Sequence, residues 1–230
     1  MNGSLNDQKV LVIGRGSGIA RAVALAARDA GAHVTAAGRD QQRLADTYAG
    51  EPGIGTETVD LTDEESVAAL GKRLGVVHHV VSTASARARG RVADLDRDAL
   101  RLSFDVKVLG PLMLAKHLAP RMSEGGSFVI FSGVAATKIT VGTLGVAITN
   151  AAADTLARSL ALELAPIRVN AISPGVIDSG AWDALGHGRP QPRVDEQPVH
   201  EHDRRAGTGG RAGGAVANRA LRQFRHGEAV

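Results

Sequence analysis

Short apolar runs alternate along the chain with longer segments whose apolar residues recur every three or four positions. The apolar runs have the length of strands and lie near residues 9–13, 32–37, 54–59, 78–82, 126–131 and 167–172. The segments with helical periodicity lie near residues 18–30, 40–48, 63–73, 97–121 and 143–164. The apolar runs are continuous, as in Phe128-Val129-Ile130-Phe131, which is typical of strands covered on both faces. This order predicts an α/β fold with a doubly wound parallel sheet.

Charged and glycine residues mark the ends of several segments. Asp63, Glu64 and Glu65 place acidic groups where a helix begins, and such groups favour the positive end of the helix dipole. The segment Glu124-Gly125-Gly126 is expected to end the long helix before the fifth strand. The helix near 143–164 is apolar around much of its circumference, so it needs a partner in the sheet or in a second subunit.

Three glycines separate the first strand from the first helix. They allow a sharp turn and let a ligand approach the backbone, while the helix that follows offers unpaired N–H groups to an anion. The predicted phosphate-binding loop consists of Gly14, Arg15, Gly16, Ser17, Gly18 and Ile19. Glycines also mark ordinary turns, but a strand before them and a helix after them favour a dinucleotide site in a Rossmann-type fold.

Composition limits the classes of protein to which this chain can belong. Its 230 residues, 43% of them hydrophobic, suit a single domain, which we place at residues 1–186. The absence of cysteine excludes disulfides and thiolate metal sites, and no metal site is predicted. Because there is no N-terminal signal pattern and no apolar run near 18 residues, we expect a cytoplasmic protein without membrane contact.

The positive charge belongs to the C-terminal segment. Residues 187–230 hold eight arginines against five acidic residues, which accounts for the formal net charge of +3. Aromatic residues number one Trp, one Tyr and four Phe, too few for base-stacking platforms, so no nucleic-acid partner is predicted. This Arg/Gly-rich tail has few large apolar residues, and we expect it to be poorly ordered.

Four segments together resemble the short-chain dehydrogenase/reductase family in order and spacing. They are the glycine loop, Asp60-Leu61 after the third strand, the turn Ser82-Thr83-Ala84-Ser85, and Arg168-Val-Asn-Ala-Ile-Ser-Pro-Gly175. The resemblance covers residues 9 to about 183. It implies an oxidoreductase that transfers a hydride between a nicotinamide dinucleotide and a small-molecule carbonyl or alcohol substrate. It also implies a homodimer or homotetramer, formed through the helices near 97–121 and 143–164.

The resemblance also implies cofactor-binding roles for residues of these segments. Asp60, beside Leu61, would bond the adenine amino group. The ribose would be lined by Thr83, Ala84 and Ser85. The nicotinamide amide would lie near Pro174, Gly175 and Ile177.

The residue that ends the second strand distinguishes the two nicotinamide dinucleotides, because an acid there bonds the ribose 2′-hydroxyl. Gly38 stands at this place and Arg39 follows it. Arg15 adds a second guanidinium, and two such groups suit a dianionic 2′-phosphate. These residues predict NADP(H) as the cofactor. Alternatively, Arg39 is a solvated residue paired with Asp40, and Arg15 is an exposed loop residue.

The catalytic positions of the family hold other residues in this chain. The alignment places Val146 at the family's tyrosine, Asn150 at its lysine, Gly133 at its serine and Lys107 at its asparagine. The single tyrosine, Tyr48, is expected far from the cleft. The usual proton donor is therefore missing from its place.

We hypothesise that Lys107 and Ser132 replace the usual catalytic residues. Lys107 would lie beside the nicotinamide, where desolvation and neighbouring arginines lower its pKa, and would donate the proton. Ser132 would orient the substrate oxygen. Alternatively, Lys107 caps backbone carbonyls or pairs with Asp105, and Ser132 makes a local hydrogen bond. The changed positions also allow a catalytically inactive protein that binds or senses NADP(H).

The residues after about 183 depart from the family pattern. The substrate-covering helices and the last strand of the family are not recognisable in residues 187–230. We therefore expect the last strand to be missing or disordered and the sixth strand to remain an open edge. Read in a neighbouring frame, the tail yields segments that resemble the family's. A frameshift near residues 184–189 is our hypothesis, and the nucleotide sequence of the gene would test it.

Overall fold

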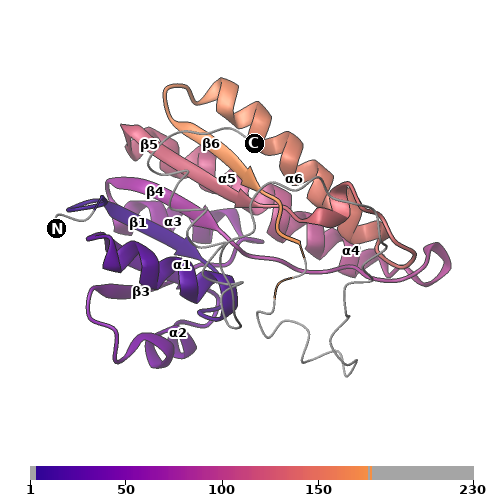
Figure 1. The fold of residues 1–230 in the computed structure, drawn as a ribbon, viewed down its shortest axis with the longest axis horizontal. Helices are drawn as coiled ribbons and strands as arrows, with labels where there is room; N and C mark the ends of the chain where they lie inside the picture. The colour runs from indigo at the N-terminus through magenta and orange to yellow at the C-terminus, as the bar shows by residue number, and fades with distance from the viewer. Residues whose placement is uncertain (1–3, 176, 178–230) are drawn as a thin grey trace, which may run out of the picture.

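Strands and helices alternate in the computed structural model, which describes residues 4–175 and 177 (Figure 1). The strands are β1 Lys9–Ile13, β2 His33–Gly38, β3 Ile54–Thr58, β4 Val77–Ser82, β5 Met122–Phe131 and β6 Arg168–Ile172. The helices are α1 Gly18–Asp29, α2 Gln41–Tyr48, α3 Glu64–Leu74, α4 Arg97–Phe104, α5 Gly110–Leu118 and α6 Leu144–Glu163. Three short 3₁₀ turns span Val92–Asp94, Ala119–Arg121 and Val134–Ala136.

The six strands of the described residues form one parallel sheet in the order β3-β2-β1-β4-β5-β6. Ile13, at the end of β1, is level with Ala37 on one neighbour and with Ser82 on the other. The carboxyl ends of β1, β2 and β4 therefore meet at one edge, where the strand order reverses between β1 and β4. Ligands of open α/β sheets bind at such a switch point. The predicted doubly wound, Rossmann-type α/β fold is confirmed.

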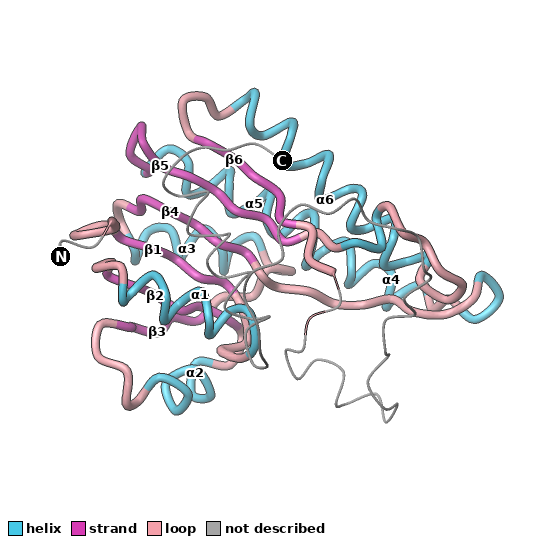
Figure 2. Tube along the Cα trace, viewed as in Figure 1, coloured by secondary structure: helices cyan, strands magenta, loops and turns pink. Residues whose placement is uncertain are grey.

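Helices cover both faces of the sheet (Figure 2). On one face, buried side chains of α1 and α2, including Val23 and Leu44, join a core cluster with Val10 and Val12 of β1. On the other face, α3, α5 and α6 pack on the strands, with Leu114 of α5 among the fully buried residues. Burial of apolar area on both faces is the main stabilising contribution and explains the continuous apolar runs of the strands.

The segment predicted as one helix near 97–121 consists of several helical pieces. α4 ends at Phe104, a π-helical turn spans Asp105–Leu109, and α5 begins at Gly110. A π-helical turn inserts an extra residue into the helix and is frequent at functional sites. Here it carries Lys107, which is only 7% exposed.

The prediction that Glu124-Gly125-Gly126 ends this helix was wrong. Helical structure ends with the 3₁₀ turn Ala119–Arg121, and β5 begins directly at Met122. The register between β4 and β5 is irregular, since Val77 pairs with Met122 while His79 pairs with Ser127. The glycines lie in this irregular part of the strand, where the extra residues of β5 are accommodated as in a β-bulge.

Within the described residues, β6 pairs with β5 alone and forms an edge of the sheet. The expected last strand, the tail at 187–230 and the hypothetical frameshift near 184–189 all lie outside the described residues. In the described part of the chain, no helix has the length and apolar character needed to cross a membrane.

Candidate cofactor cleft and buried polar residues

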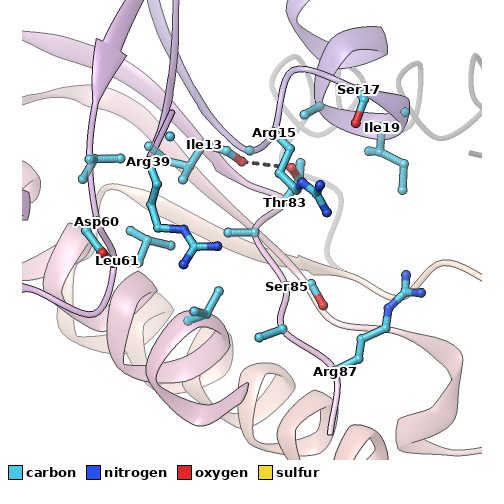
Figure 3. A pocket seen from close by; sticks show the side chains of 18 of the residues that line it. Ile13, Arg15, Ser17, Ile19, Arg39, Asp60, Leu61, Thr83, Ser85 and Arg87 are labelled. Atoms are coloured by element: carbon cyan, nitrogen blue, oxygen red, sulfur yellow. Dashed lines mark hydrogen bonds between the residues drawn. The ribbon is translucent and has the colours of Figure 1, made fainter. Parts of the chain in front are cut away.

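A cleft of about 430 Å³ opens at the carboxyl ends of β1, β2 and β4 (Figure 3). Most of the predicted cofactor-binding residues line it, namely Gly14, Arg15, Ser17, Gly18, Ile19, Arg39, Asp60, Leu61, Thr83, Ala84 and Ser85. Gly16, Pro174, Gly175 and Ile177 are not among its lining residues. The fold thus brings four segments that are distant in the sequence to one cleft.

Close neighbouring atoms or the backbone conformation require glycine at positions 14, 16 and 38. A Cβ on Gly14 would lie 2.6 Å from the Oγ1 atom of Thr83 and 2.6 Å from the Cβ of Ala20. Gly16 has a φ of +68°, a conformation that L side chains rarely adopt. A Cβ on Gly38 would lie 2.6 Å from the carbonyl oxygen of Gly14. An acid therefore does not fit at position 38 without movement of the loop.

The first turn of α1 is open to an anion. Ser17 occupies the N-cap position, but its side chain makes no capping hydrogen bond, and the first turn holds no acidic residue. The first N–H groups of a helix have no partner within the helix, and the helix dipole adds positive potential there. This end of α1 therefore fits a diphosphate, as in other dinucleotide sites.

Arg15 and Arg39 line the cleft together with the glycine loop. Both residues are exposed, and neither side chain makes an ion pair or a hydrogen bond within the part of the chain that the structure describes. The alternative pairing of Arg39 with Asp40 is not observed in the described residues. The Asp40 carboxylate caps α2 by accepting a hydrogen bond of 2.9 Å from the backbone N–H of Arg43. Two guanidinium groups are thus available to a ligand of this cleft.

Hydrogen bonds hold the other walls of the cleft in place. The hydroxyl of Thr83 donates to the carbonyl oxygen of Ile13 at 2.9 Å and so ties the end of β4 to the end of β1 (Figure 3). Oδ1 of Asp60 accepts from the backbone N–H and the hydroxyl of Thr62, at 2.9 and 2.8 Å. These bonds orient the segments after β3 and β4 before any ligand binds.

Lys107 and Ser132 lie together and are not among the residues that line the cleft, although Val106, the neighbour of Lys107 in the chain, is one of them. The Nζ atom of Lys107 donates to the carbonyl oxygen of Ser132 at 3.0 Å. Burial lowers the pKa of Lys107 to about 8; Arg87 acts in the same direction and Asp154 in the opposite one. The Oγ atom of Ser132 is buried and has no hydrogen-bond partner within the described residues. Lys107 therefore caps a carbonyl, as the alternative interpretation held, and is also desolvated, as the catalytic hypothesis requires.

Two of the other changed catalytic positions, Gly133 and Asn150, contact each other. The Nδ2 atom of Asn150 donates to the carbonyl oxygen of Gly133 at 3.3 Å, and a Cβ on Gly133 would lie 2.8 Å from Nδ2. The amide of Asn150 thus occupies the space that a side chain at position 133 would need. Val146 offers no proton, and Tyr48 is buried in the core cluster of α1 and β2, outside the cleft lining.

Sequence reasoning missed Arg87, which lines the cleft together with Ala86, Leu102 and Val106. Its signal was the alternation of arginines at positions 87, 89 and 91, directly after the predicted turn at 82–85. Arg87 is exposed, but partial desolvation in the cleft lowers its pKa, and the positive charge of Arg89 lowers it further. In the described residues, no group of three or more His, Asp or Glu is arranged to hold a metal ion.

Comparisons with known proteins agree with the fold. A family model described as enoyl-(acyl carrier protein) reductase matches residues 13–217. L-xylulose reductase of Mesocricetus auratus is 32% identical over 182 residues, which are 77% of this chain and 75% of the relative.

Solved structures give the same result. A short-chain type dehydrogenase/reductase from Mycobacterium ulcerans is 33% identical with a TM-score of 0.74, over 79% of this chain and 72% of that one. A small-chain dehydrogenase in complex with NADPH is 29% identical with a TM-score of 0.66, over 80% of this chain and 76% of that one. With the parallel sheet, its switch-point cleft and the glycine loop, these matches make the chain a member of the short-chain dehydrogenase/reductase family of oxidoreductases.

Proposed function

We propose that this protein is an NADP(H)-dependent oxidoreductase that reduces a carbonyl group or oxidises the corresponding alcohol. The observation that carries the proposal is the cleft lined by Arg15 of the glycine loop and by Arg39, in which an acid at position 38 would require the loop to move. Two guanidinium groups that make no ion pair within residues 4–175 suit the 2′-phosphate that distinguishes NADP(H) from NAD(H). The related dehydrogenase solved with NADPH supports this choice.

Residues of the cleft and of the segment after β6 would each contact one part of the cofactor. The glycine loop and the first turn of α1 would hold the diphosphate, and Arg15 with Arg39 would hold the 2′-phosphate. Asp60 and Leu61 would contact the adenine, the turn at 83–85 would line the ribose, and Pro174, Gly175 and Ile177 would lie near the nicotinamide. The cofactor, when bound, supplies the hydride.

The protein must supply the proton for the carbonyl oxygen, and Lys107 is our proposed donor. With a pKa of about 8, its side chain is mainly protonated at pH 7, yet it releases a proton more readily than an exposed lysine. Ser132, whose buried hydroxyl is unused by the described residues, would orient the substrate oxygen. Both roles rest on placement beside the nicotinamide end of the cleft.

Binding of the two dinucleotides tests the cofactor assignment. We expect nicotinamide fluorescence to show at least tenfold tighter binding of NADPH than of NADH. Arg15→Gln and Arg39→Gln should each weaken NADPH binding about tenfold and leave NADH binding unchanged, because each removes a charge-assisted hydrogen bond worth roughly 1.5–3 kcal/mol. Arg43→Gln, in α2 and outside the cleft lining, is the matched control. Equal affinities for both dinucleotides in the wild type would refute the assignment.

The contact of Asn150 with Gly133 and the apolar side chain of Val146 favour a second candidate function, an inactive protein that binds or senses NADP(H). A panel of aldehydes and ketones at saturating NADPH separates the two. Oxidation of NADPH that depends on the carbonyl compound supports the enzyme. Tight NADPH binding without any turnover supports the sensor.

Association through α4 and α6 is also part of the proposal. These helices contact each other and expose apolar side chains, among them Leu102, Leu144 and Ile148, each about 40% exposed. Such side chains suit a symmetric helix-to-helix interface. Sedimentation velocity would show a dimer or tetramer, and a monomer at micromolar concentration would contradict it. A cytoplasmic location stays a prediction.

A further inference from the structure

The cleft carries a cation that the cofactor assignment does not use. Arg87 lies in the segment between β4 and α4 and belongs to the lining of the cleft. Figure 3 shows it well away from Arg39 and Asp60, with Ser85 between. If the adenosine half of the cofactor lies at Arg39 and Asp60, Arg87 stands toward the opposite, reacting half.

Among the described residues, a second cation acts on Arg87. Arg89 follows it by two residues, and its charge makes protonation of Arg87 less favourable. Arg87 in turn disfavours the protonated form of Lys107, so the two cations share one electrostatic environment. Asp154 is the acidic group that acts on Lys107 in the opposite sense. An anion bound here would therefore be stabilised by more than one cation.

Apolar side chains flank this guanidinium within the cleft. Ala86, Leu102 and Val106 line the cleft with Arg87. A small apolar surface beside a guanidinium group would fit a short carbon chain that ends in a carboxylate. The chain would contact the apolar surface, and the carboxylate would pair with the guanidinium through two parallel hydrogen bonds.

We propose that Arg87 binds the carboxylate of the substrate, and that the substrate is a short oxo acid or the corresponding hydroxy acid. The inference rests on the proposed function, because the cofactor defines which end of the cleft is reactive. In the proposed binding mode, the anionic groups of the cofactor lie at the glycine loop, Arg15 and Arg39, whereas Arg87 lines the cleft toward its other end. The ion pair would hold the carbonyl carbon at a fixed distance from the cofactor and exclude neutral ketones from tight binding.

Calorimetry with an unreactive carboxylate tests the site without requiring turnover. Malonate and its neutral isostere malonamide are titrated into the protein saturated with NADP⁺. We expect malonate to bind at least tenfold more tightly than malonamide. Arg87→Gln should abolish this difference and change the affinity for NADP⁺ less than twofold. Arg91→Gln, an exposed arginine of the same segment outside the cleft lining, is the control and should retain the preference.

Two results would overturn the proposal. One is an Arg87→Gln protein that still prefers malonate over malonamide. The other is a loss of NADP⁺ affinity in Arg87→Gln as large as its loss of malonate affinity, because Arg87 would then bind the cofactor. If the wild type binds no dinucleotide at all, the proposed function fails, and the same malonate titrations on the free protein still decide whether Arg87 binds a carboxylate.

Kinetics give a second readout wherever a carbonyl compound is turned over. Arg87→Gln should raise KM for 2-oxobutyrate at least tenfold while kcat stays within about threefold. For butanone, which lacks the carboxylate, KM should not change. A general defect in folding would instead affect both compounds alike.

Discussion

The ammonium group of Lys107 donates to the main-chain oxygen of Ser132 at 3.0 Å and so links the π-helical turn between α4 and α5 to the end of β5. Removal of the side chain from water makes this charge costly, and the hydrogen bond offsets only part of the cost. A strongly perturbed lysine near a cleft is a candidate for acid–base chemistry, although the same contact would also serve to anchor the turn.

Replacement of Lys107 by methionine separates these two roles. The thioether preserves the apolar stem and removes the proton, so turnover should be abolished while NADPH affinity stays within about twofold. In the wild type, carbonyl reduction should decline as the pH rises through about 8, because the donor must carry its proton. Assays of NADPH oxidation measure turnover and its pH dependence, and fluorescence titration measures the affinity for NADPH. An equal loss of affinity and turnover would identify Lys107 as a structural residue.

Gly14→Ala should abolish dinucleotide binding. Its Cβ would lie 2.6 Å from Thr83 Oγ1, and the Thr83 hydroxyl is held by its bond to Ile13, so the loop must move. Overpacking of this kind costs about 1–3 kcal/mol of unfolding free energy. Gly50→Ala, where no atom lies within 4 Å of the new Cβ, is the control. Urea unfolding and NADPH titration of both variants provide the check, and normal binding by Gly14→Ala would contradict the site.

Gly133 and Asn150 should be energetically coupled. A Cβ at position 133 displaces the Asn150 amide and breaks its hydrogen bond, so Gly133→Ala should cost about 1–3 kcal/mol of stability. In an Asn150→Ala background the space is open and the cost should fall below about 0.5 kcal/mol. Chemical denaturation of the four proteins of the double-mutant cycle yields the coupling. Additive effects would mean that the two residues do not restrict each other.

Acid should destabilise the protein through His79. Its Nδ1 lies 2.8 Å from Ser127 Oγ, and burial lowers the pKa of His79 to about 4, with smaller contributions from Arg168 and His78. The unfolded chain takes up this proton near pH 6.5, so the stability that His79 contributes is fully present above that pH and is lost as the pH falls toward 4. The loss between pH 7 and 4.5 should be about 2–3 kcal/mol.

Urea unfolding at several pH values measures this loss. His79→Gln should show a smaller loss than the wild type, because the buried group no longer titrates. His33→Gln, at an exposed position, should behave like the wild type. A pH dependence that is the same in all three proteins would remove His79 as its cause.

Most of the fold follows from local patterns in the chain. Apolar runs predict the six strands, and helical periodicity predicts the principal helices. Both signals can be read from the sequence because the spacing of apolar residues within one segment shows which face of a strand or helix is buried. The end of the long helix was predicted wrongly, since an irregular pairing of β5 with β4 places Glu124-Gly125-Gly126 in a strand. Strand pairing joins distant segments, so no local signal reveals it.

For the candidate site too, one part could be predicted from the sequence and another part could not. The sequence by itself determined the glycine loop and the presence of Arg15 and Arg39 after two successive strands, because the φ of a turn and the order of strands are local properties. Only the tertiary structure decided that a π-helical turn buries Lys107 against Ser132, that Asn150 fills the space beside Gly133, and that Arg87 enters the cleft. These contacts depend on how α4, α5 and α6 pack on the sheet, and close packing of distant elements sets which polar groups lose water and which charges meet.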